Sequence, residues 1–173
     1  MKTLSIAFFL VVLQTITYAQ KSNGYGALKM PDEKVLFSFK LKNSSKIVLI
    51  CTGKNDEYLV YRFGNKEKVE LQYPSVLNTK SWNLFHYSGY SRGGGAKNDA
   101  TEQHSLSFST NKVTYKVYDD WDSGENRGEA FVTVVINGKE TKIKGEASSK
   151  KGSLGLLRNN ETLIHNYYWD ESQ

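Results

Sequence analysis

Hydrophobic and polar residues alternate along much of the chain with a period of two. Between residues 35 and 41 the apolar side chains occupy every second position, and residues 68–73 repeat this pattern. Such alternation predicts β-strands that are buried on one face and solvated on the other. The run at residues 47–51 is apolar throughout. It therefore predicts a strand that is covered on both faces.

Similar short segments recur up to residue 144 and are separated by turn-forming residues. We expect further strands at residues 57–63, 82–87, 105–108, 113–118, 130–136 and 140–144. Asn137 and Gly138, which lie between the last two, are typical of a type I′ hairpin turn. Regular strands without intervening helical periods predict an all-β domain over residues 34–173, a single-domain antiparallel β-barrel or sandwich of about eight or nine strands.

The amino terminus has the layout of a secretory signal peptide. Lys2 precedes an apolar run at residues 6–13, and small residues follow near Ala19. This order predicts a signal peptide over residues 1–19, and the apolar run is too short to span a membrane as a helix. We therefore expect an exported protein, periplasmic or secreted, without a stable membrane anchor. The polar, glycine-bearing residues 20–33 are expected to form a flexible lead-in.

The net charge and the number of cysteines limit which partners the protein can be expected to bind and whether disulfides can stabilise it. The formal net charge of the 173-residue chain is +5, and removal of the signal peptide lowers it by one. Because many basic residues are interleaved with acidic ones, the charge does not predict a nucleic-acid partner. Cys51 is the single cysteine, so no intramolecular disulfide can form. Its place in an apolar run predicts a buried structural thiol.

The segment at residues 87–95, Tyr-Ser-Gly-Tyr-Ser-Arg-Gly-Gly-Gly, is unlike its surroundings. Three consecutive glycines suit neither a strand nor a helix, because each loses much backbone freedom on ordering. We expect a presented loop that begins a polar connection over residues 88–103, and loops of that length are usually functional or mobile. A solvated connection without a role is the alternative. The expected partner-binding residues are Tyr87, Ser88, Gly89, Tyr90, Ser91, Arg92 and Gly93.

Residues 89–93 also match the G-x-S-x-G pattern of a serine-hydrolase nucleophile elbow. That elbow needs a preceding strand and a following helix on a parallel sheet, because the helix start helps to present the hydroxyl. Here Gly94 and Gly95 follow, and the chain lacks the α/β pattern. We therefore assign no catalytic residue and expect a non-enzymatic protein. A carboxylate pair for glycoside hydrolysis stays open as an alternative, although no cleft-sized set of loops surrounds the acidic residues.

No metal site or cofactor is predicted. His86, His104 and His165 lack the spacing of metal ligands. The acidic turn expected at residues 119–125 begins like a calcium loop at Asp120, but its glycine falls one position too early and no distal glutamate completes the pattern. A solvated acidic turn is the simpler interpretation, and weak ion binding is the alternative.

Ser88, Gly89 and the tyrosine that follows carry a resemblance to a known family. A Ser-Gly-Tyr segment after a central strand, on an exported all-β domain of this size, resembles the bacterial periplasmic lysozyme inhibitors. In that family a loop with a Ser-Gly-x-x-Tyr-like or Ser-Gly-Ala-Arg-Tyr motif enters the lysozyme cleft and engages the catalytic carboxylates. Here Tyr90 stands earlier than the family's tyrosine, Arg92 has a different offset, and Cys51 lacks a partner for the bridge that some inhibitors form. The resemblance implies a protein partner, a lysozyme or another cell-wall hydrolase.

Two functional hypotheses follow. The first is an exported, non-enzymatic binding protein that engages a macromolecular partner through residues 87–95 and inhibits a lysozyme or other cell-wall hydrolase. Because many lysozymes are basic, the positive charge of this chain fits a less basic target better. The second is a small-ligand or glycan-binding β-barrel in which Trp82, Tyr90 and Trp121 stack on the ligand. A filled interior favours the first hypothesis, and a deep apolar cavity favours the second.

Overall fold

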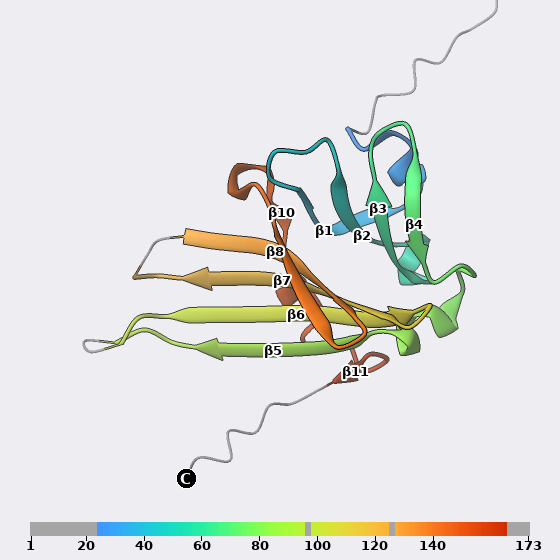
Figure 1. Ribbon diagram of the computed structural model, residues 1–173. Coiled ribbons are helices and arrows are strands. Elements are labelled where there is room, and N and C mark those ends of the chain that lie inside the picture. The colour runs from blue at the N-terminus through green and yellow to red at the C-terminus, as the bar shows by residue number, and fades with distance from the viewer. Residues whose placement is uncertain (1–23, 96–97, 125–126, 166–173) are drawn as a thin grey trace, which may run out of the picture.

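The computed structural model describes residues 24–95, 98–124 and 127–165 (Figure 1). The expected signal peptide and the first residues of the lead-in lie outside these ranges. The described chain forms two β-sheets that pack together, so the all-β prediction is confirmed. The architecture is a sandwich, and the described residues form no closed barrel. Among the described residues, no helix is both long and apolar enough to cross a membrane.

The smaller sheet has five antiparallel strands. Its spatial order is β10 (Lys151–Gly152), β1 (Lys34–Lys40), β2 (Ile47–Thr52), β3 (Leu59–Gly64) and β4 (Val69–Tyr73). Every residue of β2 is buried, which its continuous apolar run predicted. One face of this sheet meets the larger sheet, and the amino-terminal segment packs on the other face.

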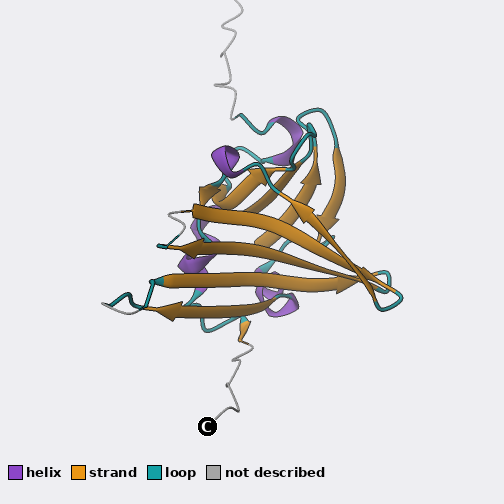
Figure 2. Ribbon diagram, turned by 60° about the vertical axis from the view of Figure 1, so that its left-hand side comes forward, coloured by secondary structure: helices purple, strands orange, loops and turns teal. Residues whose placement is uncertain are grey.

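The larger sheet has six strands. Its spatial order is β11 (Ile164–His165), β5 (His86–Arg92), β6 (Thr101–Thr110), β7 (Val113–Asp122), β8 (Arg127–Ile136) and β9 (Lys139–Lys144). β11 runs parallel to the start of β5, and the other neighbours are antiparallel. The long strands β5 to β8 lie side by side and extend past the smaller sheet (Figures 1 and 2). The described residues form eleven strands, more than predicted, because the two-residue strands β10 and β11 were not expected from the sequence.

Two hairpin turns of the larger sheet have the same backbone conformation. Asn137 and Gly138 have φ angles of 51° and 78°, so the type I′ prediction is confirmed. Asn111 and Lys112, between β6 and β7, have φ angles of 50° and 62°. The second turn was expected only as a break in the strand pattern, because lysine is not a residue that usually adopts this left-handed conformation.

Short 3₁₀ helices connect the strands. They are η1 (Gly26–Leu28), η2 (Lys54–Asp56), η3 (Thr79–Leu84), η4 (Ala147–Ser149) and η5 (Leu154–Leu157). η3 replaces the first part of the strand expected at residues 82–87. The side chain of Asn78 accepts a hydrogen bond from the backbone N–H of Lys80, and Ser81 bonds back to the Asn78 N–H. This capping box fixes a helical start where the apolar pattern indicated a strand.

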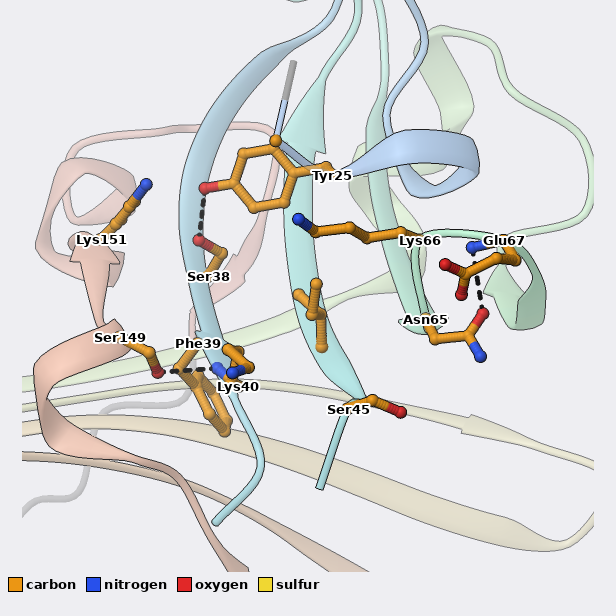
Figure 3. A pocket seen from close by; sticks show the side chains of 12 residues that line it. Tyr25, Ser38, Phe39, Lys40, Ser45, Asn65, Lys66, Glu67, Ser149 and Lys151 are labelled. Atoms are coloured by element: carbon orange, nitrogen blue, oxygen red, sulfur yellow. Dashed lines mark hydrogen bonds between the residues drawn. The ribbon is translucent and has the colours of Figure 1, made fainter. Parts of the chain in front are cut away.

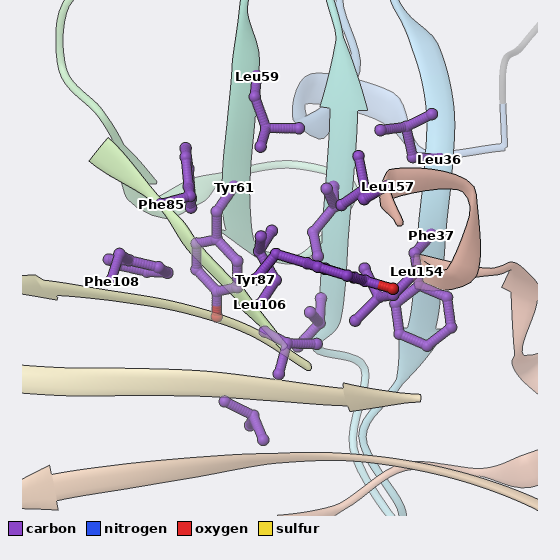
Figure 4. Close-up of a cluster of buried hydrophobic side chains, with 14 of the residues drawn as sticks. Leu36, Phe37, Leu59, Tyr61, Phe85, Tyr87, Leu106, Phe108, Leu154 and Leu157 are labelled. Carbon is purple, nitrogen blue, oxygen red and sulfur yellow. The ribbon is translucent and has the colours of Figure 1, made fainter. Parts of the chain in front are cut away.

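The space between the sheets is filled by aromatic and aliphatic side chains (Figure 4). Phe108 of β6 stacks on Tyr73 and Tyr115, with ring centroids 4.4 and 5.1 Å apart. Leu154 and Leu157 of η5 are buried in the same cluster. Because protein interiors of this kind are close-packed, the sandwich has a solid core.

The lead-in packs against the smaller sheet where the structure describes it. Leu28 is fully buried in a cluster with Leu49 and Cys51, and Glu33 is a buried partner of Arg62. The prediction of a flexible segment is therefore wrong for residues 24–33, because these side chains find partners on β2 and β3. Cys51 is buried, as the sequence predicted, and burial raises the pKa of its thiol to about 12.

Candidate functional site on the large sheet

Residues 86–92, most of which were expected to begin a loop, form strand β5. Every residue of this strand pairs in register with β6. Residues 88–91 gave no strand signal because apolar and polar residues do not alternate there. Backbone pairing with β6, rather than burial of an apolar face, stabilises this part of the strand. The loop prediction is wrong for residues 88–92, whereas Tyr87 lies in a strand as expected. The long connection shrinks to residues 93–100, in which Gly95 forms a bridge with Asn98.

β5 divides the predicted site residues between two faces of the sheet, because successive side chains of a strand point to opposite sides. The inner face receives Tyr87, Gly89 and Ser91, the outer face receives Ser88, Tyr90 and Arg92, and Gly93 follows the strand. The seven residues therefore do not share one face of the sheet. Ser91, the serine of the elbow pattern, lies within a strand rather than on a turn between a strand and a helix.

Tyr87 is a core residue with 2% of its surface exposed. Its hydroxyl lies 2.9 Å from Nδ1 of His104. Burial lowers the pKa of His104, and the charge of Arg158 lowers it further. Gly89 leaves room for this pair, because a Cβ at that position would lie 2.5 Å from the Tyr87 oxygen. The Tyr87 and His104 rings are therefore both buried.

The acidic turn expected at residues 119–125 is also partly a strand, since β7 continues to residue 122. Asp119 is buried on the inner face, where it accepts hydrogen bonds from Ser153 Oγ (2.8 Å) and the Leu154 backbone N–H (2.9 Å). Asp120 points to the outer face. Within the described ranges, no three His, Cys, Asp or Glu side chains come together as a metal site.

The outer face of β5, β6 and β7 gathers polar and aromatic side chains around one pocket of about 160 Å³. We call this surface the binding face, and its residues are Ser88, Tyr90, Arg92, Gln103, Lys116, Tyr118 and Asp120. The strand register explains the gathering, because Tyr90, Gln103 and Asp120 lie directly opposite one another on adjacent strands. Tyr90 is 52% exposed and forms one wall of the pocket.

Asp120 is the least satisfied polar group of the binding face. Its Oδ1 atom is buried and accepts no hydrogen bond from any described residue. Burial raises the pKa of Asp120, and the neighbouring charge of Asp119 raises it further. A buried acceptor without a partner costs about 1–3 kcal/mol. A ligand that donates a hydrogen bond to Oδ1 would remove this penalty.

The floor of the binding face is stiffened by stacked rings. Tyr118 stacks on Phe131 of β8, with ring centroids 4.3 Å apart. The Nζ atoms of Lys116 and Lys142 lie over these two rings, 4.9 Å from the Tyr118 centroid and 3.5 Å from the Phe131 centroid. Cation–π contacts and ring stacking of this kind restrict side-chain rotation. The pocket therefore has a preformed shape.

The three aromatic residues expected to stack on a glycan do not share a surface. Trp82 is 6% exposed and donates a hydrogen bond to the backbone oxygen of Asp56 (3.0 Å), so it is a core residue. Trp121 is 37% exposed but follows Asp119 by two positions and lies on the inner face. Tyr90 alone lies on the binding face. The predicted stacking platform of Trp82, Tyr90 and Trp121 is therefore wrong.

Four residues of the binding face were not expected from the sequence: Gln103, Lys116, Tyr118 and Asp120. Lys116 and Tyr118 stand at alternate positions of a predicted strand, which marks them as sharing a face. No local signal indicates which strands lie beside β5, so the sequence could not predict that these four residues lie on one surface with Tyr90.

Comparisons with known protein families, with curated proteins and with solved structures find no match to this chain.

Proposed function

We propose that this protein is an exported, non-enzymatic binding protein that engages a macromolecular partner, a lysozyme or another cell-wall hydrolase, through its binding face. The observation that carries the proposal is Tyr90, a half-exposed ring on a paired strand beside a preformed pocket. Aromatic side chains on rigid elements supply large contact area at a low cost in conformational entropy, as interface anchors do. Export rests on the amino-terminal sequence pattern.

The solid core supports an external partner over a ligand carried inside the fold. A carrier needs a deep apolar cavity, whereas aromatic side chains such as Phe108 and Tyr61 fill the space between the sheets here. The binding face is instead an open surface on long strands. Open surfaces of this kind suit contact with another macromolecule.

The donors on β5 suit a carboxylate-lined cleft. The hydroxyls of Ser88 and Tyr90 and the guanidinium of Arg92 are on one face of the strand, and hydrogen bonds from a guanidinium to a carboxylate are among the strong ones. One nitrogen of Arg92 donates to the backbone oxygen of Asp99 (3.1 Å), which holds the side chain at the end of the hairpin. A hydrolase cleft with two catalytic carboxylates presents acceptors of the matching kind.

The test compares a double variant on the binding face with a matched variant on the same sheet. Tyr90→Ala with Arg92→Ala removes the central ring and the cation. Ile136→Ala with Lys139→Ala removes an exposed apolar residue and a cation at the opposite end of β8 and β9. Each protein is immobilised and exposed to a panel of purified lysozymes and other cell-wall hydrolases, and inhibition is followed as turbidity loss of a peptidoglycan suspension.

We expect the wild type and the Ile136/Lys139 variant to retain and inhibit at least one hydrolase, and the Tyr90/Arg92 variant to lose both properties. Far-ultraviolet circular dichroism verifies that all three proteins are folded. Equal retention by both variants would show that the partner uses another surface. Absence of retention by the wild type across the panel would contradict a hydrolase as partner.

One observation favours glycan binding as a second candidate. Tyr90, Gln103 and the unpaired Asp120 oxygen surround a polar pocket on the outer surface, and a sugar ring offers a face for stacking and hydroxyl donors. Titration with soluble peptidoglycan fragments, followed by isothermal calorimetry, separates the two candidates. Binding that Asp120→Ala abolishes supports the glycan, whereas binding of a hydrolase without affinity for the fragments supports the protein partner.

A further inference from the structure

A second pocket, of about 370 Å³, opens on the outer face of the smaller sheet (Figure 3). Its lining comes from the amino-terminal segment, strands β1 and β2, the turn between β3 and β4, and residues 149–151. None of these residues belongs to the binding face. We propose that this pocket is a separate site for a small organic anion with an apolar body. Its volume lies within the usual range of small-molecule sites, about 300–1,000 Å³.

The charges around the pocket favour an anionic ligand. Lys40, Lys66 and Lys151 line it, and Glu67 is the single acidic residue among the described lining residues. Lys66 makes no ion pair with any described residue. Lys40 has only a long contact with Glu146, 3.9 Å between two half-exposed groups. Cations that outnumber the acidic groups around them create a positive potential that attracts a negative ligand.

Part of the pocket lining is apolar, which favours a ligand with an apolar body. Ile47 is a buried apolar residue of the lining, and Tyr25 lines the same pocket and packs against the cluster that contains Ile47. The Tyr25 hydroxyl is 2.8 Å from Ser38 Oγ, which holds the ring in place. In Figure 3 the side chain of Lys66 extends toward Tyr25, so a charged group and an aromatic surface face the same space. A planar or aliphatic ligand with one anionic group can contact both the lysine and the aromatic ring.

The walls of the pocket are tied to the sheet. The backbone N–H of Ala27 donates to the Lys66 oxygen (2.8 Å), and Gly26, with φ of +57°, allows this approach because a Cβ there would lie 2.1 Å from that oxygen. On the other side, the Lys40 N–H donates to Ser149 Oγ (2.9 Å) and Lys151 pairs with Ser38 across β10 and β1. A preformed pocket loses less conformational entropy on binding.

The probe for this site is 8-anilinonaphthalene-1-sulfonate, an anion with an aromatic body whose fluorescence rises on binding. The full chain is titrated as wild type, as Lys66→Glu and as Lys68→Glu. Lys68 is two positions from Lys66 and lies outside the pocket lining, so its variant makes the same charge change without touching the site. N-phenyl-1-naphthylamine, which has the same rings without the sulfonate, serves as the uncharged comparison.

We expect Lys66→Glu to weaken binding of the sulfonate about tenfold, the equivalent of one modest ion pair, and Lys68→Glu to leave it within about twofold. We expect the uncharged probe to bind more weakly than the sulfonate and to be insensitive to Lys66→Glu. Tyr25→Ala should weaken both probes, because it removes the aromatic wall. Equal effects of Lys66→Glu and Lys68→Glu, equal affinity for the two probes, or no binding by the folded wild type would each overturn the proposal.

Discussion

The two sheets differ in what happens to their outer faces. On the smaller sheet, Leu49, Cys51 and Val60 are buried beneath the amino-terminal segment, whose Leu28 completes the cluster. On the larger sheet, Tyr90 stays half exposed, and the described residues form no comparable apolar cluster on the outer face. The amino-terminal segment therefore covers the outer face of the smaller sheet, whereas the described residues leave Tyr90 exposed on the outer face of the larger sheet.

The polar groups of the two faces differ in the same way. The carboxylate of Glu33 receives hydrogen bonds from Arg62, from the Tyr58 hydroxyl (2.9 Å) and from the Met30 N–H (2.8 Å). Arg62 also donates to Gln72 and to a backbone oxygen. On the larger sheet, the buried Asp120 Oδ1 has no partner among the described residues. Complete pairing indicates a structural role, whereas the unpaired acceptor beside an exposed ring is the feature on which the proposed ligand contact rests.

The largest effect is expected from breaking the buried pair under the amino-terminal segment. Arg62→Met should lower the free energy of unfolding by about 3–5 kcal/mol, because it leaves the Glu33 carboxylate buried without its partner. Lys46→Met is the matched control, since it breaks an ion pair with Glu70 that is partly exposed, and such pairs contribute about 1 kcal/mol or less. Urea unfolding at neutral pH measures both. Equal losses of unfolding free energy in the two variants would mean that the buried Glu33–Arg62 pair stabilises the fold no more than an exposed pair does.

A smaller loss is expected on the inner face of β5. Gly89→Ala should lower the free energy of unfolding by about 1–3 kcal/mol, because the new methyl group overlaps Tyr87 and His104. Gly93→Ala is its control, since a Cβ there meets no described atom within 4 Å; its effect should stay within about 0.5 kcal/mol. Thermal unfolding measures the stability of both variants. A Gly89→Ala protein as stable as Gly93→Ala would show that Tyr87 and His104 relax freely.

The pH dependence of stability should separate the two sheets. Burial lowers the pKa of His104 below its ordinary value of 6.5, so the unfolded chain takes up this proton first and stability falls as pH decreases from 6.5. Burial alone would raise the pKa of Glu33, but hydrogen bonds from Arg62, Met30 and Tyr58 and the charge of Arg62 lower it below 4.5. Its contribution is therefore present above pH 4.5 and is lost as pH falls through the lowered value.

Unfolding in urea across this pH range measures both steps. Each group adds a slope of at most about 1.4 kcal/mol per pH unit in its own window. His104→Gln should flatten the window just below 6.5, and Glu33→Gln should flatten the window below 4.5. A single unfolding step that neither variant alters would contradict the assignment of these two groups.

The smallest change in stability is expected on the binding face. Asp120→Asn should leave the free energy of unfolding unchanged or raise it by up to about 1 kcal/mol, because the raised pKa of Asp120 means that the folded state disfavours its charge. Chemical unfolding at neutral pH provides the measurement. A loss as large as that of Arg62→Met would place Asp120 among the structural pairs and remove the contrast between the two faces.

Several features could be read from the sequence because they depend on near neighbours. The alternation at residues 113–118 and 130–136 and the Asn137–Gly138 turn predicted strands and a hairpin that the structure confirms. Period-two burial and positive φ angles are properties of a few consecutive residues. Tyr90, Ser88 and Arg92 were likewise singled out by their composition alone, although their conformation was predicted wrongly.

Other features depend on contacts between distant residues. β5 is a strand because β6 pairs with it, and Gly89 is needed because His104 of β6, paired with Tyr87, lies against it. Glu33 is held by Arg62, far along the chain, which turns a polar lead-in into a cover for the smaller sheet.

By itself the sequence determined the all-β class, most of the strands and one end of the binding face. Tertiary structure alone decided that Gln103 and Asp120 lie beside Tyr90, since register between strands depends on pairing rather than on local pattern. It also decided which outer face the chain covers. The physical reason is the same in both cases: backbone pairing and burial join residues that are distant in sequence, and no local periodicity reports which partners they take.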